Sequence, residues 1–468
     1  MTRPSGLDLF RRLPSVDQAL KTDAIGALAH EFGRTCVLEA VRAELEALRA
    51  AIAAGRIDEE ALTGALETFP LAIRERARLA ATSSLRRVIN ASGVVIHTNL
   101  GRAPLSRQAA EKLVECATGY SNLEFDLEKG ERGRRDDHAK RLLAQLFARQ
   151  GVGEAETIVV NNNAAAVFLA LAALARGGEV IVSRGELVEI GGSFRIPDIM
   201  AESGAVLREV GTTNRTRIED YERAITDNTR LLLRVHRSNF EIVGFTERPE
   251  LAELAALGQR RGVPVMEDLG SGAMVDMRAF GVPGETGLCD SLRAGASLVT
   301  CSGDKLFGGP QAGLVSGRPD LVARLRKHPL FRALRVDKMC YAALEATFAA
   351  YLREDYQEIP LLRMLALPAE AVERRCIALA TALPGASAEV LPVRTMIGGG
   401  AAPGKSLPSF AVVLTPSTLS AADLALALRR RPVPIIARIE DDRVLIDLRT
   451  VEEADDGYLA QSLSALKF

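Results

Sequence analysis

The pattern that most limits the fold of this chain is a regular alternation of short β-rich segments with helical or loop stretches between residues 157 and 315. Strands separated by helices build a mostly parallel sheet that carries helices on its faces. The sequence therefore predicts an α/β domain whose sheet has about seven strands. The predicted strands are residues 157–160, 179–182, 205–210, 230–235, 263–266, 298–301 and 312–315.

The length of the chain, 468 residues, exceeds what one hydrophobic core usually holds, so two or three domains are expected. Residues 1–87 are dominated by Ala, Leu, Glu and Arg, and their apolar residues recur at helix spacing, which predicts an N-terminal helical domain. Residues 88–367 then form the large α/β domain, and residues 368–468 form a smaller α/β domain.

The smaller domain is expected to contain strands at residues 410–414, 435–439 and 444–448. The polar stretch at residues 440–443 predicts a hairpin turn between the last two strands. The glycine-rich stretch at residues 395–409 lacks the GK[ST] ending of a phosphate-binding P-loop. We interpret it as a flexible loop without a catalytic role.

Composition narrows the possible functions. The 59 basic and 60 acidic side chains balance, so overall charge does not indicate a nucleic-acid-binding protein, although a local patch is compatible with it. The six cysteines form no CxxC pair and the five histidines form no HExxH motif, so we expect no metal site. The sequence has no long apolar run and no signal-peptide pattern, and a cytoplasmic protein without membrane spans is expected.

One lysine, Lys305, lies in the segment TCSGDKLFGGPQ between a predicted strand and a glycine turn. Most lysines are hydrated on the surface, and a lone lysine on a turn is usually one of them. A lysine that is partly removed from water has a lowered pKa, and its neutral amine reacts with carbonyl groups. Lys305 is therefore a candidate for the reactive residue if its neighbours support that role.

Polar residues that follow other predicted strands support it. Asp268 follows the fifth strand, and the ends of parallel strands meet at one edge of a sheet. A lysine and a carboxylate so placed suit pyridoxal 5'-phosphate, because the lysine carries the cofactor and the carboxylate keeps its ring nitrogen protonated. Other candidates for cofactor binding are Ser302, Asn162 and Asn163 at the start of a predicted helix, and His236. An acid at a strand end is often only a helix cap, and this alternative stays open when Asp268 is considered without Lys305.

Two groups of arginines have both a plain and a functional interpretation. Arg332 and Arg335 are three residues apart, so in a helix they share one face and can bind one anion together, or they form a solvated basic face. In the N-terminal domain the basic residues cluster at positions 74, 76, 78, 86 and 87. That cluster fits a solvated helix face better than phosphate contacts.

Several long motifs make the chain resemble the bacterial selenocysteine synthases, a family of L-seryl-tRNA(Sec) selenium transferases. The motifs are RVINASGVVIHTNLGRAPLS, YSNLEFDLEKGERG, VVNNNAAAVFLAL, VSRGELVEIGGSFRIPDIM, EVGTTNRT, RVHRSNFEIVGF, EDLGSG and SGDKLFGGPQAG. The resemblance extends from the N-terminal helices to the C-terminal strands.

The resemblance implies a fold-type-I pyridoxal phosphate-dependent transferase, similar to aspartate aminotransferase, that works as a homodecamer, a ring of five dimers. It implies conversion of seryl-tRNA(Sec) to selenocysteinyl-tRNA(Sec) through an aminoacrylyl intermediate, with selenophosphate as the selenium donor. Lys305 would bear the cofactor and Asp268 would pair with its ring nitrogen. The donor pocket would contain the catalytic Asp304 and three arginines, and the N-terminal domain would hold the tRNA. These arginines are Arg102, Arg332 and Arg335.

Two other functions are compatible with parts of the sequence. A related pyridoxal phosphate-dependent lyase would act on a small amino acid or amino sugar acid without tRNA, but it would not need the N-terminal domain. A tRNA-binding scaffold with an inactive cofactor site would not need Lys305, Asp268 and Ser302 together.

Overall fold

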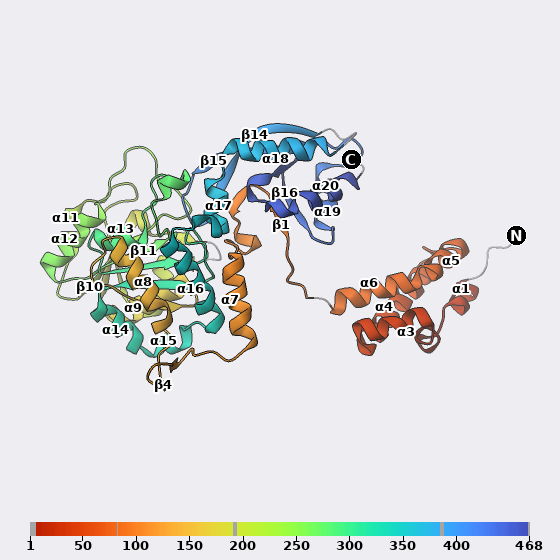
Figure 1. Cartoon of the computed structure of the whole chain (residues 1–468), viewed down its shortest axis with the longest axis horizontal. Coiled ribbons are helices and arrows are strands. Elements are labelled where there is room, and N and C mark those ends of the chain that lie inside the picture. Colours follow the sequence, from red (N-terminus) through yellow and green to blue (C-terminus); the bar gives the residue numbers. More distant parts are fainter. Residues whose placement is uncertain (1–5, 82, 191–193, 384–387, 467–468) are drawn as a thin grey trace. The chain divides into compact units, whose positions relative to one another are not determined.

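The computed structural model describes residues 6–81, 83–190, 194–383 and 388–466. The chain forms two compact units, Met1–Arg87 and Val88–Phe468 (Figure 1). No helix among the described residues combines the length and the apolar character that a membrane crossing needs.

The N-terminal unit is helical, as its composition predicts. Its longest helix, α4, buries Val37, Val41 and Leu45 at helix spacing, against Ile73 of α6. The neighbouring Leu38 is only half-buried. The helices are α1 Gly6–Arg12, α2 Val16–Leu20, α3 Asp23–Phe32, α4 Arg34–Ala53, α5 Glu59–Glu67 and α6 Phe69–Ala81.

The large sheet has seven strands within the described residues, in the order β5-β13-β12-β11-β10-β6-β9. Strand β13 is antiparallel to both of its neighbours and the other pairs are parallel, which confirms the predicted, mostly parallel sheet. The strands are β5 Glu156–Val160, β6 Glu179–Ser183, β9 Val206–Val210, β10 Thr229–Val235, β11 Val265–Gly270, β12 Leu298–Ser302 and β13 Gly313–Gly317. Strand β11 is longer than predicted, so Asp268 lies inside the strand and not after it.

Both faces of this sheet are covered. Leu231 and Leu233 of β10 pack into a core with α9, α10 and α14, whereas Leu232 packs into a core with α11 and α12. This alternation is the two-residue period of a strand that is buried on both sides. The helices of this part are α7 Arg107–Thr118, α8 Asp137–Arg149, α9 Asn163–Leu174, α10 Ile196–Ser203, α11 Ile218–Ala224, α12 Leu251–Arg261, α13 Leu288–Arg293, α14 Pro319–Lys327, α15 Pro329–Leu334, α16 Lys338–Arg353 and α17 Pro360–Ala366.

A second sheet has six strands within the described residues, in the order β1-β16-β17-β15-β14-β2. Two of them come from the start of the unit Val88–Phe468, so the expected division at residues 367 and 368 does not separate the two sheets. The strands are β1 Ile89–Ala91, β2 Val94–Ile96, β14 Ala388–Gly398, β15 Ser406–Leu414, β16 Ile435–Glu440 and β17 Arg443–Asp447. The helices around it are α18 Ala369–Thr381, α19 Ala421–Arg429 and α20 Asp456–Ser464.

Residues 395–409 differ from the expected flexible loop. The end of β14 and the start of β15 fall in this stretch, where Thr395 pairs with Leu407 and Met396 with Ser406. The stretch therefore forms the turn of a long antiparallel hairpin. The predicted hairpin turn between β16 and β17 is confirmed, and Asp441 and Asp442 have φ angles of 48° and 54°, which a type I′ turn requires.

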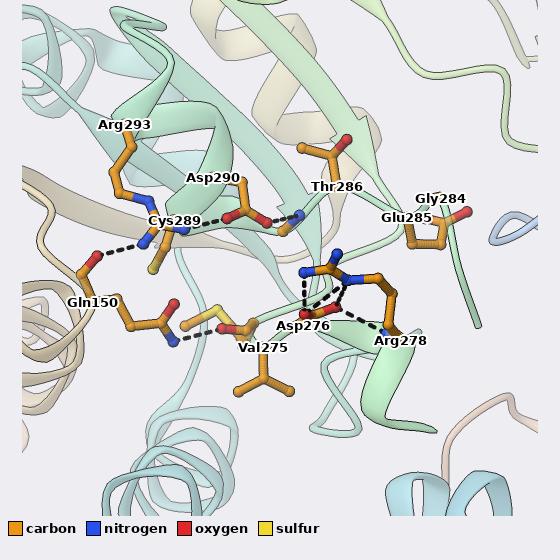
Figure 2. A pocket seen from close by; sticks show the side chains of 12 residues that line it. Gln150, Val275, Asp276, Arg278, Gly284, Glu285, Thr286, Cys289, Asp290 and Arg293 are labelled. Carbon is orange, nitrogen blue, oxygen red and sulfur yellow. Dashed lines mark hydrogen bonds and ion pairs between the residues drawn. The ribbon is translucent and has the colours of Figure 1, made fainter. Parts of the chain in front are cut away.

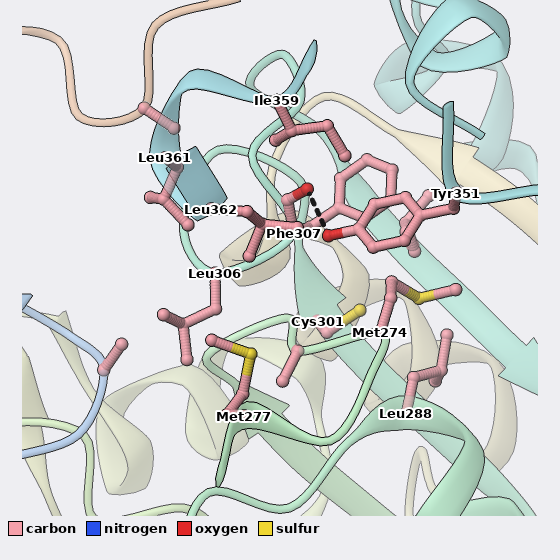
Figure 3. Packing of buried hydrophobic residues seen from close by; sticks show 14 of the residues in the cluster. Met274, Met277, Leu288, Cys301, Leu306, Phe307, Tyr351, Ile359, Leu361 and Leu362 are labelled. Atoms are coloured by element: carbon pink, nitrogen blue, oxygen red, sulfur yellow. Dashed lines mark hydrogen bonds between the residues drawn. The ribbon is translucent and has the colours of Figure 1, made fainter. Parts of the chain in front are cut away.

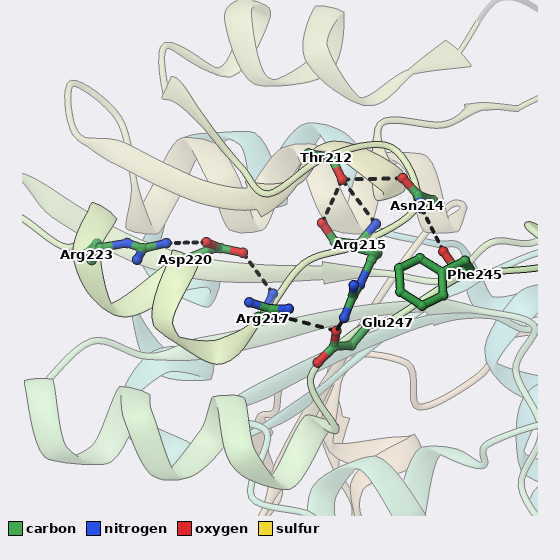
Figure 4. Close-up of polar contacts among 8 residues, drawn as sticks. All are labelled: Thr212, Asn214, Arg215, Arg217, Asp220, Arg223, Phe245 and Glu247. Carbon is green, nitrogen blue, oxygen red and sulfur yellow. Dashed lines mark hydrogen bonds and ion pairs between the residues drawn. The ribbon is translucent and has the colours of Figure 1, made fainter.

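The EVGTTNRT motif forms an exposed polar network with the segment that contains Phe245 and Glu247 (Figure 4). The Arg215 guanidinium pairs with the Glu247 carboxylate and lies 4.2 Å from the centre of the Phe245 ring. Asn214 donates a hydrogen bond to the Phe245 carbonyl oxygen. These contacts fix the chain that follows β9 to the loop that follows His236.

Candidate active site

Lys305 is buried. The residue lies in a tight turn after β12 and is 7% exposed. Its Nζ donates a hydrogen bond to the Gly400 carbonyl oxygen over 3.0 Å. Burial lowers the pKa of Lys305, although the nearby Asp268 carboxylate opposes that change. The side chain thus has the setting that a reactive neutral amine requires.

The turn that carries Lys305 is fixed by an aromatic cluster (Figure 3). Phe307 is fully buried and its ring stacks on the Tyr351 ring, with 5.5 Å between centroids. The Tyr351 hydroxyl donates a hydrogen bond to the Phe307 carbonyl oxygen over 2.9 Å. Because both the side chain and the backbone of Phe307 are held, the position of Lys305 two residues earlier is held as well.

Asp268 lies on β11, the strand that neighbours β12, and is 3% exposed. Its Oδ1 accepts a hydrogen bond from Asn163 Nδ2 over 2.8 Å, and Thr300 Oγ1 lies 3.4 Å from the same oxygen. Burial raises the pKa of Asp268, whereas the bond from Asn163 and the charge of Lys305 act in the opposite direction. A buried carboxylate of this kind is costly unless a positive or hydrogen-bonding partner meets it.

His236 and Glu285 border the same region. The His236 backbone N–H donates a hydrogen bond to the Asp268 carbonyl oxygen, and His236 Nε2 lies 3.7 Å from Glu285 Oε2. Burial and the charge of Lys305 lower the pKa of His236 to about 4, so the imidazole is neutral at neutral pH. Burial raises the pKa of Glu285. Glu285 Oε1 also accepts a hydrogen bond from the Ala402 N–H over 2.6 Å.

Glu285 lines two cavities. One has a volume of about 670 Å³ and also contains the Arg293–Asp290 and Arg278–Asp276 ion pairs (Figure 2). The other has a volume of about 540 Å³ and is lined by His236, Ala402 and several arginines. The second cavity therefore reaches the residues that surround Lys305.

Arg102 and Asp304 lie together beside Lys305. Arg102 Nη1 is 2.6 Å from Asp304 Oδ2, and the Ala103 N–H donates a hydrogen bond to the Asp304 carbonyl oxygen. Arg102 has a φ angle of 63°, a conformation that non-glycine residues adopt only when their surroundings enforce it. Ser302, the last residue of β12, is also buried.

Three candidate residues, Asn162, Arg332 and Arg335, have surroundings other than those that the sequence predicted. Asn162 caps α9, and its side chain accepts a hydrogen bond from the Ala165 N–H. Helix α15 ends at Leu334, so Arg335 lies outside the helix and does not share a helix face with the exposed Arg332. Arg335 Nη1 lies 3.5 Å from Glu124 Oε1.

The buried residues fit a polar cofactor. Asn163 Oδ1 and His236 Nδ1 are buried and have no hydrogen-bond partner within the described residues. Both residues are close to Asp268, because Asn163 Nδ2 and the His236 backbone N–H each donate a hydrogen bond to it. Such atoms are rare unless a ligand or water pairs with them. Helix α9 begins beside Asp268, and the free N–H groups at a helix N-terminus attract phosphate. An amine, a carboxylate and the N-terminus of a helix thus lie around one site.

Gly400, Ala402 and Glu285 also contribute to the surroundings of Lys305, and the sequence did not indicate this. Gly400 and Ala402 belong to the hairpin turn that was predicted to be a flexible loop. The three consecutive glycines at positions 398–400 were a signal, because such runs allow the backbone to approach another group closely. Glu285 follows no predicted strand, and no feature of its sequence marks it.

Comparisons with known proteins agree with this geometry. The family model described as L-seryl-tRNA selenium transferase matches residues 88–452, and the model described as selenocysteine synthase N terminal matches residues 10–49. The L-seryl-tRNA(Sec) selenium transferase of Geobacter metallireducens is 48% identical, with 98% of this chain and 100% of that protein covered. The protein of the same name from Moorella thermoacetica is 49% identical, with 97% of this chain and 96% of that protein covered.

A solved structure of D-glucosaminate-6-phosphate ammonia-lyase shares the fold. Its TM-score is 0.55 at 19% sequence identity, with 81% of this chain and 95% of that chain covered. At this level of identity the likeness concerns the fold alone.

Proposed function

Because this chain belongs to the L-seryl-tRNA selenium transferase family, we propose that it converts L-seryl-tRNA(Sec) into L-selenocysteinyl-tRNA(Sec) and uses selenophosphate as the selenium donor. The fold is that of the fold-type-I pyridoxal phosphate-dependent transferases. The observation that carries the proposal is that Lys305, which follows β12, and Asp268, on the neighbouring strand β11, are both buried. Both lie within the stretch that the family model matches.

The cofactor is pyridoxal 5'-phosphate, which supplies an electron sink for negative charge at the serine Cα. Lys305 Nζ would hold it, and the Asp268 carboxylate would stabilise a protonated ring nitrogen. The raised pKa of buried Asp268 makes a positive partner especially favourable there. The N-terminus of α9 and the Ser302 hydroxyl would bind its phosphate. Asn163 Oδ1 and His236 Nδ1, which are unpaired, would be available to form hydrogen bonds with the cofactor.

When its amine is free, Lys305 moves the proton at the serine Cα. Its lowered pKa places the neutral, proton-accepting form closer to neutral pH than for an exposed lysine. Burial at 7% exposure also excludes water from the amine. The neutral His236 adds no positive charge that would compete with the substrate amine.

The selenium donor is an anion, and it binds through the arginines of a pocket that Arg102, Arg332, Arg335 and Asp304 line. Support comes from the ion pair between Arg102 and Asp304, because Asp304 directly precedes Lys305 in the same turn. The side chain of Arg102 is 35% exposed and thus still accessible to a ligand. For Arg332 and Arg335 the support is that both lie within residues 88–452, which the family model matches. Arg335 also contacts Glu124 in this chain.

The helical unit of residues 1–87 holds the tRNA, and the chain assembles as a ring of five dimers. Support for the first part is the match of residues 10–49 to the family's N-terminal model. That match also disfavours a lyase that acts on a small amino acid or amino sugar acid, because such a lyase has no need of this unit.

The test is incubation of the full-length protein with selenophosphate and either seryl-tRNA(Sec) or seryl-tRNA(Ser), followed by analysis of the aminoacyl group. We expect selenocysteine on tRNA(Sec) only. Recovery of unchanged serine from both tRNAs by a cofactor-loaded protein would contradict the proposal. Conversion of a small amino acid at a high rate would favour the lyase.

A further inference from the structure

The turn formed by residues 398–405 connects β14 and β15 and lies directly against the reactive lysine. Lys305 Nζ donates its hydrogen bond to the carbonyl oxygen of Gly400 in this turn. Gly400 has a φ angle of 83°, and a Cβ atom at this position would lie 2.5 Å from Lys305 Nζ. Only glycine allows this approach without a displacement of the lysine.

The 398–405 turn is itself held on several sides. The Ala402 N–H donates a hydrogen bond to Glu285, and Ala401 and Ala402 are almost completely buried. Gly398 pairs with Ile96 of β2, and a Cβ atom at Gly399 would lie 2.7 Å from the Thr98 methyl group. The Gly400 carbonyl is therefore a fixed acceptor and not part of a loosely placed loop.

A buried amine needs a hydrogen-bond acceptor whenever it is not covalently bonded to the cofactor. In the proposed reaction Lys305 passes between bonded and free forms, and the free amine must point at the same place in each cycle. Building on the proposed function, we propose that Gly400 is a positioning residue whose carbonyl oxygen holds the Lys305 amine in its free form. The C-terminal sheet thereby takes part in the site of the large sheet.

The hydrogen bond also affects the protonation of Lys305, because a carbonyl acceptor favours the ammonium form. The charged groups that face the amine are the carboxylates of Asp268, Asp304 and Glu285 and the guanidinium of Arg102. His236 also faces it. Loss of the carbonyl would leave Arg102 and burial to disfavour the ammonium form, so the amine would lose its proton at lower pH.

Two variants of the full-length chain test this role. Gly400→Ala places a methyl group against Lys305 Nζ. Gly404→Ala is a matched control, because Gly404 lies in the same turn with a φ angle of 69° and its Cβ would meet only the flexible Glu241 side chain at 3.2 Å. Both variants carry a similar backbone strain, but only one contacts the lysine.

Two measurements apply to each variant. The first is the affinity for pyridoxal 5'-phosphate, from the absorbance band that forms as the cofactor is added. The second is the rate at which an acylating reagent modifies Lys305 in the cofactor-free chain as a function of pH, from the mass of the Lys305 peptide. Because the bond holds only the free amine, its loss destabilises the cofactor-free form, so Gly400→Ala should tighten cofactor affinity by up to about tenfold and should move the acylation midpoint to lower pH. Gly404→Ala should leave both values within about twofold of the parent chain.

The inference is wrong if Gly400→Ala matches Gly404→Ala in both measurements, or if its acylation midpoint stays in place or rises. Should Gly400→Ala fail to fold, Gly399→Ala displaces the same turn through Thr98 without contacting Lys305, and it should tighten cofactor affinity to a smaller extent. An unchanged affinity in that variant would also overturn the inference. Neither measurement uses tRNA or selenium, so a failure here is distinguishable from a failure of the proposed function.

Discussion

The two compact units of this chain use charge in opposite ways. Among the described residues of the N-terminal unit no charged side chain is buried, and arginines such as Arg74 and Arg78 pair with glutamates at the surface. The catalytic unit, Val88–Phe468, buries Lys305, Asp268 and Arg449. Because a buried charge is costly, it persists where partners or ligands compensate for it. The first unit is therefore suited to present a surface, and the second to hold a chemical site.

The strongest test of this contrast is Lys305→Ala. We expect turnover to fall below detection and the cofactor absorbance band to be lost, because the amine that holds the cofactor is removed. Binding of seryl-tRNA, measured by filter retention or fluorescence, should change by less than about threefold, since the N-terminal unit is intact. Selenocysteine formation by this variant would refute the assignment of Lys305.

Deletion of residues 1–80 tests the other unit. The remaining chain should stay folded and load its cofactor, because residues 88–468 form a compact unit with hydrophobic clusters of their own. Its affinity for seryl-tRNA(Sec) should fall at least about tenfold, since the unit that we propose to hold the tRNA is removed. If the truncated chain binds seryl-tRNA as tightly as the full chain, the N-terminal unit has another function.

A smaller effect is expected from the double variant Arg332→Ala and Arg335→Ala. Loss of two guanidinium groups that bind an anion should slow selenium addition roughly tenfold to a hundredfold. Removal of the seryl hydroxyl should proceed at the parent rate, because Lys305 and Asp268 are unchanged. Single-turnover assays with and without selenophosphate separate the two reactions. An equal decrease in both would contradict a role restricted to the donor.

The smallest effects concern stability. Arg449 is 2% exposed and donates hydrogen bonds to the carbonyl oxygens of Met364, Leu367 and Pro408. Arg449→Ala should lower the free energy of unfolding by about 3 kcal/mol, because buried acceptors lose their partner. Arg74→Ala removes an exposed ion pair and should cost less than about 1 kcal/mol. Urea denaturation measures both, and equal costs would remove the contrast between the units.

The sequence predicted the large sheet well because its strands are short apolar runs between helical stretches. The ends of the strands were predicted less well. Strand β11 continues four residues beyond its predicted end, through the polar residues Glu267 and Asp268 to Gly270. Strand β14 was missed because its residues alternate between exposed and half-buried and include Pro392. The pairing of β1 with β16 joins residues from opposite ends of the catalytic unit, and local sequence patterns carry no signal for such contacts.

The site was predictable where a residue type has one chemical use. Lys305 and Asp268 were found because an amine and a carboxylate at neighbouring strand ends suit one class of cofactor. Glu285 and Gly400 were not, because the first acts through its burial and the second through its backbone. Both properties arise only when the 398–405 turn folds back on the large sheet.

The identity of the lysine that holds the cofactor is the most direct test of the whole account. The cofactor-loaded protein is reduced with borohydride, digested, and its peptides are mapped by mass spectrometry. We predict a pyridoxyl mass increase on the peptide that contains Lys305, at close to one per chain. An increase on another lysine, or none on a protein that shows the absorbance band, would contradict the account.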